Sequence, residues 1–127
     1  MKPFELNVSA VATATVTQQN TAISAGSGSL SVFATPFMIA LMEEATCNAV
    51  ASYLENDETT VGTKIDVAHT KASGIGTVVT ATATIVATEG RKIVFDVLAV
   101  DDKGNSIGNG TIERFLVNGE KFMAKLG

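Results

Sequence analysis

Apolar and polar residues alternate almost without a break through residues 4–17. Val11 is the residue that interrupts this alternation. A period of two in a stretch rich in Thr and Val is typical of a strand with one face in water, so we expect a long first strand here. The next segment, residues 18–31, contains Gly26–Ser27–Gly28–Ser29, a composition that is typical of a loop.

The pattern changes at Thr35. Thr35–Pro36 has the form of a helix N-cap followed by proline at the first helical position, where the missing N–H has no cost. Residues 37–54 contain no Gly or Pro and are rich in Ala, Met, Leu and Glu, which predicts a helix of about five turns. Because this helix is apolar on nearly all sides, we expect other elements to surround most of it.

Four more strands are predicted after the acidic residues 55–58. Alternate residues share an apolar face in each of the first three, namely Val61, Thr63, Ile65, Val67 and His69, then Val79, Ala81, Ala83 and Ile85, then Ile93, Phe95, Val97 and Ala99. Gly90 suits a tight hairpin, and residues 101–105 form another turn. The last strand covers residues 106–117, where Gly108 and Gly110 indicate a bulge or a close approach of backbones. The tail 120–126 has the pattern of a short helix.

This order of elements predicts an α+β hotdog fold, in which an antiparallel sheet of about five strands wraps around one long central helix. The 127 residues are enough for a single domain, 1–127, and leave no room for a second. A single layer of this kind leaves an edge strand and part of the helix uncovered. We therefore expect a homodimer, with a tetramer of two dimers left open.

Composition removes several classes of function. Hydrophobic residues make up 46% of the chain and charged residues 17%, which argues against intrinsic disorder. The net charge of −4, without a basic cluster, argues against a nucleic acid partner. One cysteine and one histidine argue against a disulfide framework and an ordinary zinc site. No apolar stretch approaches the ~20 residues that span a bilayer, and no apolar leader follows Met1, so we expect no membrane partner and a cytoplasmic location.

Three side chains are candidates for chemistry, and each also has a structural explanation. Glu43 has mostly apolar helical neighbours, and a carboxylate buried in such surroundings is paired, protonated or reactive. The structural explanation is that its side chain reaches solvent past a thin edge of the protein. His69, the only histidine, ends an inward-facing series, a place more often taken by a structural histidine than by a catalyst. Thr35 is explained as a helix cap. No nucleophile elbow, P-loop or dinucleotide fingerprint accompanies them.

Four blocks of sequence carry a resemblance to a known family. Residues 32–43, 61–63 with His69–Thr70, 89–91 and 107–115 closely resemble, in order and spacing, the fluoroacetyl-CoA thioesterase-like family of hotdog thioesterases. The resemblance implies hydrolysis of a small acyl-CoA to the free acid and CoA, with CoA as part of the substrate and no bound cofactor or metal. The family's catalytic residues fall on Thr35, Glu43 and His69, and the candidates for substrate binding are Gly62, Arg91 and Arg114.

Two departures from the family pattern accompany this resemblance. The fluoroacetyl-selective members carry a phenylalanine lid just before the helix, whereas this chain has Gly26–Ser27–Gly28–Ser29 there. A histidine of the family's last motif is replaced by Ile112. The first departure argues against fluoroacetyl selectivity, and the second removes one polar group.

Helical geometry limits how the three catalytic candidates meet. Glu43 follows Thr35 by eight residues, which is about 12 Å along a straight helix, so one thioester carbonyl cannot hydrogen-bond to both. Either the turn at Thr35 is not helical, or Thr35 of one protomer and Glu43 of the other form a shared site, which we favour. Glu43 would then act as a general base on water or attack the thioester to give an anhydride.

Two other functions are compatible with the same architecture. The main alternative is a protein that binds acyl-CoA or another small ligand without turnover. A hotdog dehydratase or hydratase ranks last, because its Asp-x-x-x-x-His-type arrangement is not seen in this sequence.

Overall fold

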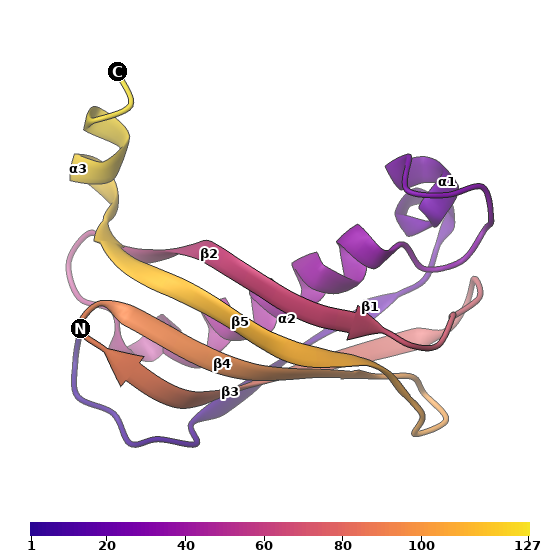
Figure 1. The fold of residues 1–127 in the computed structure, drawn as a ribbon, viewed down its shortest axis with the longest axis horizontal. Helices are drawn as coiled ribbons and strands as arrows, with labels where there is room; N and C mark the ends of the chain where they lie inside the picture. The colour runs from indigo at the N-terminus through magenta and orange to yellow at the C-terminus, as the bar shows by residue number, and fades with distance from the viewer.

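The computed structural model describes all residues 1–127, and its main feature is one antiparallel sheet of five strands (Figure 1). The strands are β1 (Ser9–Thr15), β2 (Glu58–His69), β3 (Val78–Glu89), β4 (Lys92–Val100) and β5 (Ser106–Asn118). Their spatial order is β1-β3-β4-β5-β2. The predicted α+β hotdog architecture is confirmed.

The order of the strands differs from a simple series of hairpins. β3–β4 and β4–β5 are consecutive pairs, as predicted, but β2 pairs with β5 and not with β3. Residues 70–77 therefore carry the chain from one edge of the sheet to its interior. As a result β2 is an edge strand, with one row of backbone groups that no strand of the same chain pairs.

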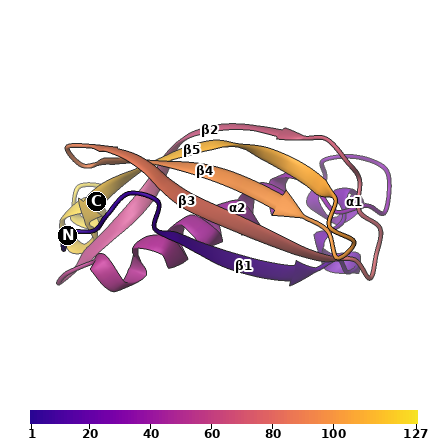
Figure 2. The same ribbon diagram turned by 90° about the horizontal axis from the view of Figure 1, so that it is seen from below.

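The long helix α2 (Thr35–Val50) lies along one face of the sheet, mainly against β1 and β3, and continues into a 3-10 turn, η2 (Ala51–Tyr53) (Figure 2). Its buried residues recur every three or four positions and are Met38, Leu41, Met42, Ala45, Thr46, Ala49 and Val50. The other side, which includes Phe37 and Cys47, is exposed. Within one chain the helix is therefore covered on one side, not on most sides as its apolar pattern predicted.

The core lies between α2 and the inner face of β3 and β4. The two predicted apolar series on these strands are buried, with Val79, Ala81, Ala83 and Ile85 on β3 and Ile93, Phe95, Val97 and Ala99 on β4. Met38 and Met42 are fully buried against the same cluster. Each large side chain that is fully buried here contributes about 1.5–3 kcal/mol to folding.

The first strand is shorter than its alternating pattern predicted. β1 begins at Ser9, because Asn7 adopts a left-handed backbone with a φ of 72° that an extended strand does not accommodate. Within β1 the alternation is as expected, and Val11 is exposed on the polar face. The loop region that follows contains two short elements, η1 (Gln18–Asn20) and α1 (Ala22–Ala25), the latter closed by Gly26 at a φ of 70°.

A β-bulge divides the face that was predicted for β2. Gly62 lies opposite Arg114 and Lys64 opposite Glu113, so Thr63 is an extra residue without a partner. The extra residue reverses the alternation. Val61 therefore does not share the inward face of Ile65, Val67 and His69, and the prediction of one continuous inward series is wrong.

The two glycines of β5 show both expected features, because the backbones approach closely and a register shift adjoins Gly108, where Ala99 pairs with Gly108 but Val100 pairs with Ser106. A methyl group at Gly108 would lie 2.6 Å from Sδ of Met38, and one at Gly110 would overlap the carbonyl oxygen of Asp66. Gly110 also has a φ of 156°. The chain ends in the expected short helix, α3 (Gly119–Ala124), and none of its helices has the length and apolar character needed to cross a membrane.

Candidate active site

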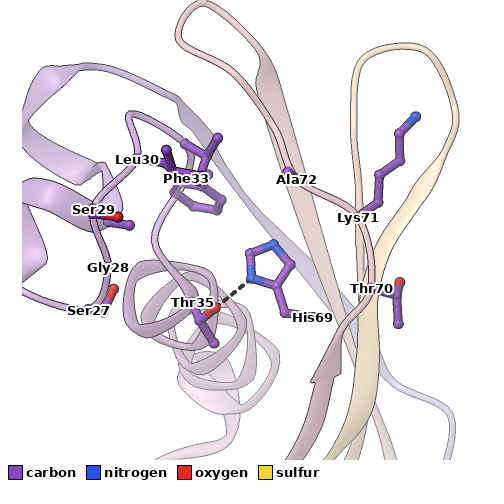
Figure 3. A pocket seen from close by; sticks show the side chains of 12 residues that line it. Ser27, Gly28, Ser29, Leu30, Phe33, Thr35, His69, Thr70, Lys71 and Ala72 are labelled. Atoms are coloured by element: carbon purple, nitrogen blue, oxygen red, sulfur yellow. Dashed lines mark hydrogen bonds between the residues drawn. The ribbon is translucent and has the colours of Figure 1, made fainter.

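Thr35 and His69 form a hydrogen-bonded pair where α2 begins and β2 ends. Oγ1 of Thr35 lies 2.8 Å from Nδ1 of His69 (Figure 3). Thr35 is the first residue of the helix, and the N-cap is Ala34, so the explanation of Thr35 as a helix cap is wrong. Its hydroxyl instead contacts a residue 34 positions along the chain. The pair is therefore built by tertiary structure and not by local helix geometry.

The Thr35–His69 pair lines a cavity of about 380 Å³. Figure 3 shows residues Ser27–Leu30 on one side of this cavity and residues Thr70–Ala72 on the other, with the imidazole ring between them and the start of α2. Nε2 of His69 is buried and has no hydrogen-bond partner in the chain. Burial lowers the pKa of His69 below its ordinary value of 6.5, while the nearby backbone of Lys71 acts in the opposite direction. The ring is thus kept neutral, with one nitrogen free for a ligand.

The N-terminus of α2 supplies a further polar feature beside this pair. The first N–H groups of a helix have no intrahelical partner, and the helix dipole places partial positive charge there. Pro36 lacks an N–H and removes one of these donors. The remaining donors suit an oxygen that gains negative charge during a reaction.

Glu43 belongs to a second cluster, in which Arg114 is the central group. Nη1 of Arg114 donates to Oε2 of Glu43 at 2.8 Å. Arg114 is buried, with 7% of its surface exposed, whereas the Glu43 side chain is 34% exposed. The guanidinium also donates from Nε to Oγ1 of Thr60 and from Nη2 to the Thr60 carbonyl oxygen, both at 2.9 Å. The Glu43 carboxylate is thus neither free in solvent nor unpaired.

Gly62 creates the space that the Glu43–Arg114 pair occupies. A methyl group at this position would lie 2.6 Å from Oε2 of Glu43 and 3.4 Å from Nη1 of Arg114. Gly62 faces Arg114 directly across the β2–β5 pair. Two of the predicted substrate-binding residues, Gly62 and Arg114, therefore lie beside the carboxylate.

The two clusters do not meet within one chain. Glu43 and Arg114 line a second cavity of about 510 Å³, which includes Phe37 but neither Thr35 nor His69. The helix is regular from Thr35 through Glu43, so the eight-residue separation along α2 holds as expected. A site that uses all three predicted catalytic residues therefore needs a second copy of the chain.

Arg91 lies apart from both clusters. It follows Gly90 in the hairpin between β3 and β4, and its carbonyl accepts a hydrogen bond from the N–H of Leu116. It lines a groove with Glu58, at the end of β2 opposite to His69. Lys71 lines the Thr35–His69 cavity, and its Nζ lies 3.6 Å from Oδ2 of Asp101.

Thr60 is the part of the site that the sequence did not indicate. Threonine is an ordinary residue in a strand, and only the pairing of β2 with β5 places Thr60 near Arg114. The available signal was Arg114 itself, a charged residue two positions after Ile112 on the inward face of β5. A buried arginine requires several acceptors, but the sequence does not say which residues supply them.

The comparison with known families establishes to which family the chain belongs. Residues 16–120 match the model of the fluoroacetyl-CoA-specific thioesterase family. The chain belongs to this family. The fluoroacetyl-CoA-specific thioesterase family thus covers both clusters described above, from Val16 to Glu120.

Individual relatives agree with this membership. The fluoroacetyl-CoA thioesterase of Streptantibioticus cattleyicolor is 47% identical over 95 residues, which are 75% of this chain and 68% of that protein. A structure of the fluoroacetyl-CoA thioesterase FlK aligns with a TM-score of 0.92 at 36% identity, covering 98% of this chain and 96% of the other. A point mutant of FlK in complex with fluoroacetate and CoA aligns with a TM-score of 0.86 at 37% identity, covering 94% and 99% of the two chains.

Proposed function

We propose that this member of the fluoroacetyl-CoA-specific thioesterase family is an acyl-CoA thioesterase that hydrolyses small acyl-CoA thioesters at sites shared between two protomers. The observation that carries the proposal is the Glu43 carboxylate, held by the buried Arg114 guanidinium at the wall of a partly apolar cavity. Arg114 fixes the carboxylate through Oε2, which leaves Oε1 without a hydrogen bond in the chain and able to accept a proton from water. The Thr35–His69 pair supplies the groups that bind the thioester carbonyl.

The edge strand β2 supports a shared site in a homodimer. Strands related by a two-fold axis pair in antiparallel orientation, so residues at equal distances on either side of the axis become neighbours. Because Thr63 is an extra residue, Gly62 and His69 each lie three ladder positions from Asp66. An axis that passes at Asp66 therefore brings Gly62 beside His69 of the partner subunit. Because Gly62 contacts Glu43 and His69 contacts Thr35, this arrangement joins the two clusters twice per dimer.

The same arrangement gives Arg91 a route to the substrate. Arg91 lies at the end of β2 opposite to His69, so antiparallel pairing moves it toward the Thr35–His69 cavity of the partner subunit. Together with Lys71 at that cavity, it would offer positive charge to the phosphates of CoA. Coenzyme A takes part as a portion of the substrate.

In the proposed mechanism the carbonyl group is bound first and water attacks second. Thr35 donates its hydroxyl proton toward Nδ1 of His69, which places the imidazole proton on Nε2 and makes this nitrogen a donor to the thioester oxygen. Backbone N–H groups at the start of α2 add to this oxyanion site. Water attacks the carbonyl carbon as its proton passes to the Glu43 carboxylate. The C–S bond then breaks, and this proton moves on to the leaving sulfur.

The residues at the opening of the Thr35–His69 cavity affect which acyl groups the site accepts. Ser27, Gly28 and Ser29 line it, at the place where the fluoroacetyl-selective members of the family carry a phenylalanine lid. Small acyl groups in general, without preference for fluoroacetyl, therefore fit this site. Binding without turnover has no observation in its favour, since both clusters contain reactive groups.

Release of free CoA thiol from a panel of acyl-CoA esters tests this function. We expect turnover of short acyl chains by the wild-type protein and a loss of roughly 10²–10⁴-fold in kcat for Glu43→Gln, the range of general base catalysis. Glu5→Gln is the control, because this carboxylate is exposed and lines neither the Glu43 cavity nor the Thr35–His69 cavity. Silence of the wild-type protein across all chain lengths would instead favour a binding protein.

A further inference from the structure

Thr60 is the only residue besides Glu43 that holds the Arg114 guanidinium. Its hydroxyl accepts from Nε and its carbonyl accepts from Nη2, both at 2.9 Å. Thr60 and Arg114 are each 7% exposed, so neither hydrogen bond is readily replaced by water. Thr60 itself does not line the cavity of Glu43 and makes no hydrogen bond to the carboxylate.

Because the guanidinium is planar, its two hydrogen bonds with Thr60 also set the direction of its hydrogen bond with Glu43. Arginine presents its N–H groups in a rigid fork, so fixing the directions of Nε–H and one Nη2–H also fixes the direction of Nη1–H. Nη1–H is the group that donates to Oε2 of Glu43 at 2.8 Å. The β2–β5 register makes this possible, because Thr60 lies opposite Leu116, two residues beyond Arg114.

From this geometry we propose that Thr60 is a positioning residue for hydrolysis, which acts on Glu43 through Arg114. The inference rests on the proposed function, since it assumes that Glu43 takes part in the reaction. When the hydroxyl is removed, the Thr60 carbonyl remains as one acceptor and the guanidinium can rotate about that contact. Oε2 of Glu43 then loses its fixed donor, while the groups that bind substrate at Thr35 and His69 are untouched.

The test uses Thr60→Val, which replaces the hydroxyl by a methyl group, and Thr60→Ser, which retains it. We expect Thr60→Val to lower kcat about tenfold with KM within about twofold, since small misplacements of catalytic groups act on the chemical step. Thr60→Ser should restore kcat to near the wild-type value. Thr59→Val is the control, because Thr59 is exposed at the neighbouring position of β2 and belongs to neither cluster.

Two further measurements separate positioning from a general loss of structure. In an Arg114→Lys background, which lacks the Nε–H donor, Thr60→Val should have little further effect on kcat, so the two substitutions are not additive. Hydrogen exchange of the Arg114 Nε–H, followed by NMR, should be faster in Thr60→Val than in Thr60→Ser. If Thr60→Val does not fold, Thr60→Ala removes the same hydroxyl and is judged by the same criteria.

The outcomes distinguish this inference from the proposed function. An inactive wild-type protein would contradict the proposed function, whatever the Thr60 variants do. An active wild-type protein, with Thr60→Val equal to it in kcat, would overturn the positioning role. Equal losses in Thr60→Ser and Thr60→Val would do the same, because the role depends on the hydroxyl.

Discussion

Gly62→Ala places a single methyl group against the Glu43–Arg114 pair. The new carbon would lie 2.6 Å from Oε2 of Glu43, so the carboxylate must move by about 0.8 Å to reach an ordinary contact of 3.4 Å. Arg114 is buried and held by Thr60, whereas the Glu43 side chain is partly exposed, so Glu43 is the group that moves. A displacement approaching 1 Å at a catalytic group lowers the rate by about 10- to 100-fold.

Stability should change little, because the methyl group meets the end of a flexible side chain and not backbone. Gly62 has no positive φ, so alanine is accommodated there without backbone strain. We expect kcat in the thiol-release assay to fall about 10- to 100-fold, with the midpoint of thermal unfolding within about 4 °C of wild type. The control is Gly74→Ala, where a methyl group meets nothing within 4 Å. A Gly62→Ala protein as active as Gly74→Ala would refute the assignment of Glu43.

Three further predictions concern pH and packing. Because the pKa of His69 is below 6.5 in the folded protein, stability should decline as the pH falls below about 6.5, and His69→Gln should show a shallower decline in urea unfolding between pH 5 and 8. Hydrogen bonds from Asn105 lower the pKa of Asp101 to about 2, so Asp101→Asn should lower the thermal midpoint at pH 7, and the difference should shrink as the pH falls from 3.8 toward 2. Gly110→Ala should destabilise the protein by at least about 1–3 kcal/mol in urea unfolding, since its methyl group meets the Asp66 backbone, and an unchanged midpoint would contradict this packing.

Local patterns were sufficient to predict most elements of the fold. The alternation along β3 and β4 and the long apolar helix α2 correspond to buried faces in the structure. The order of strands was not predictable in this way, because the pairing of β2 with β5 depends on contacts between distant segments. The bulge at Thr63 was missed for a similar reason, since one extra residue leaves the alternating pattern of the sequence unchanged.

The candidate site, too, was predicted only in part. The resemblance drew attention to Thr35, Glu43 and His69, and helical spacing indicated that Thr35 and Glu43 do not reach one thioester carbonyl if both lie on the same straight helix. The other residues of the Glu43 cluster became apparent only from the tertiary structure. The carboxylate's partner, Arg114, and the residue that orients it, Thr60, lie 71 and 17 positions from Glu43 in the sequence. Their contacts depend on the register of two strands that no local pattern defines.

The shared site is tested most directly by mixing two inactive variants. Glu43→Gln and His69→Ala are purified separately, unfolded together and refolded as a mixture, and thiol release from a short acyl-CoA is then measured. A mixed dimer would combine Glu43 of one chain with Thr35 and His69 of the other, so one of its two sites would be intact. We expect recovery of about a quarter of the wild-type specific activity, because half of randomly paired dimers are mixed. A mixture as inactive as its two components would contradict the account.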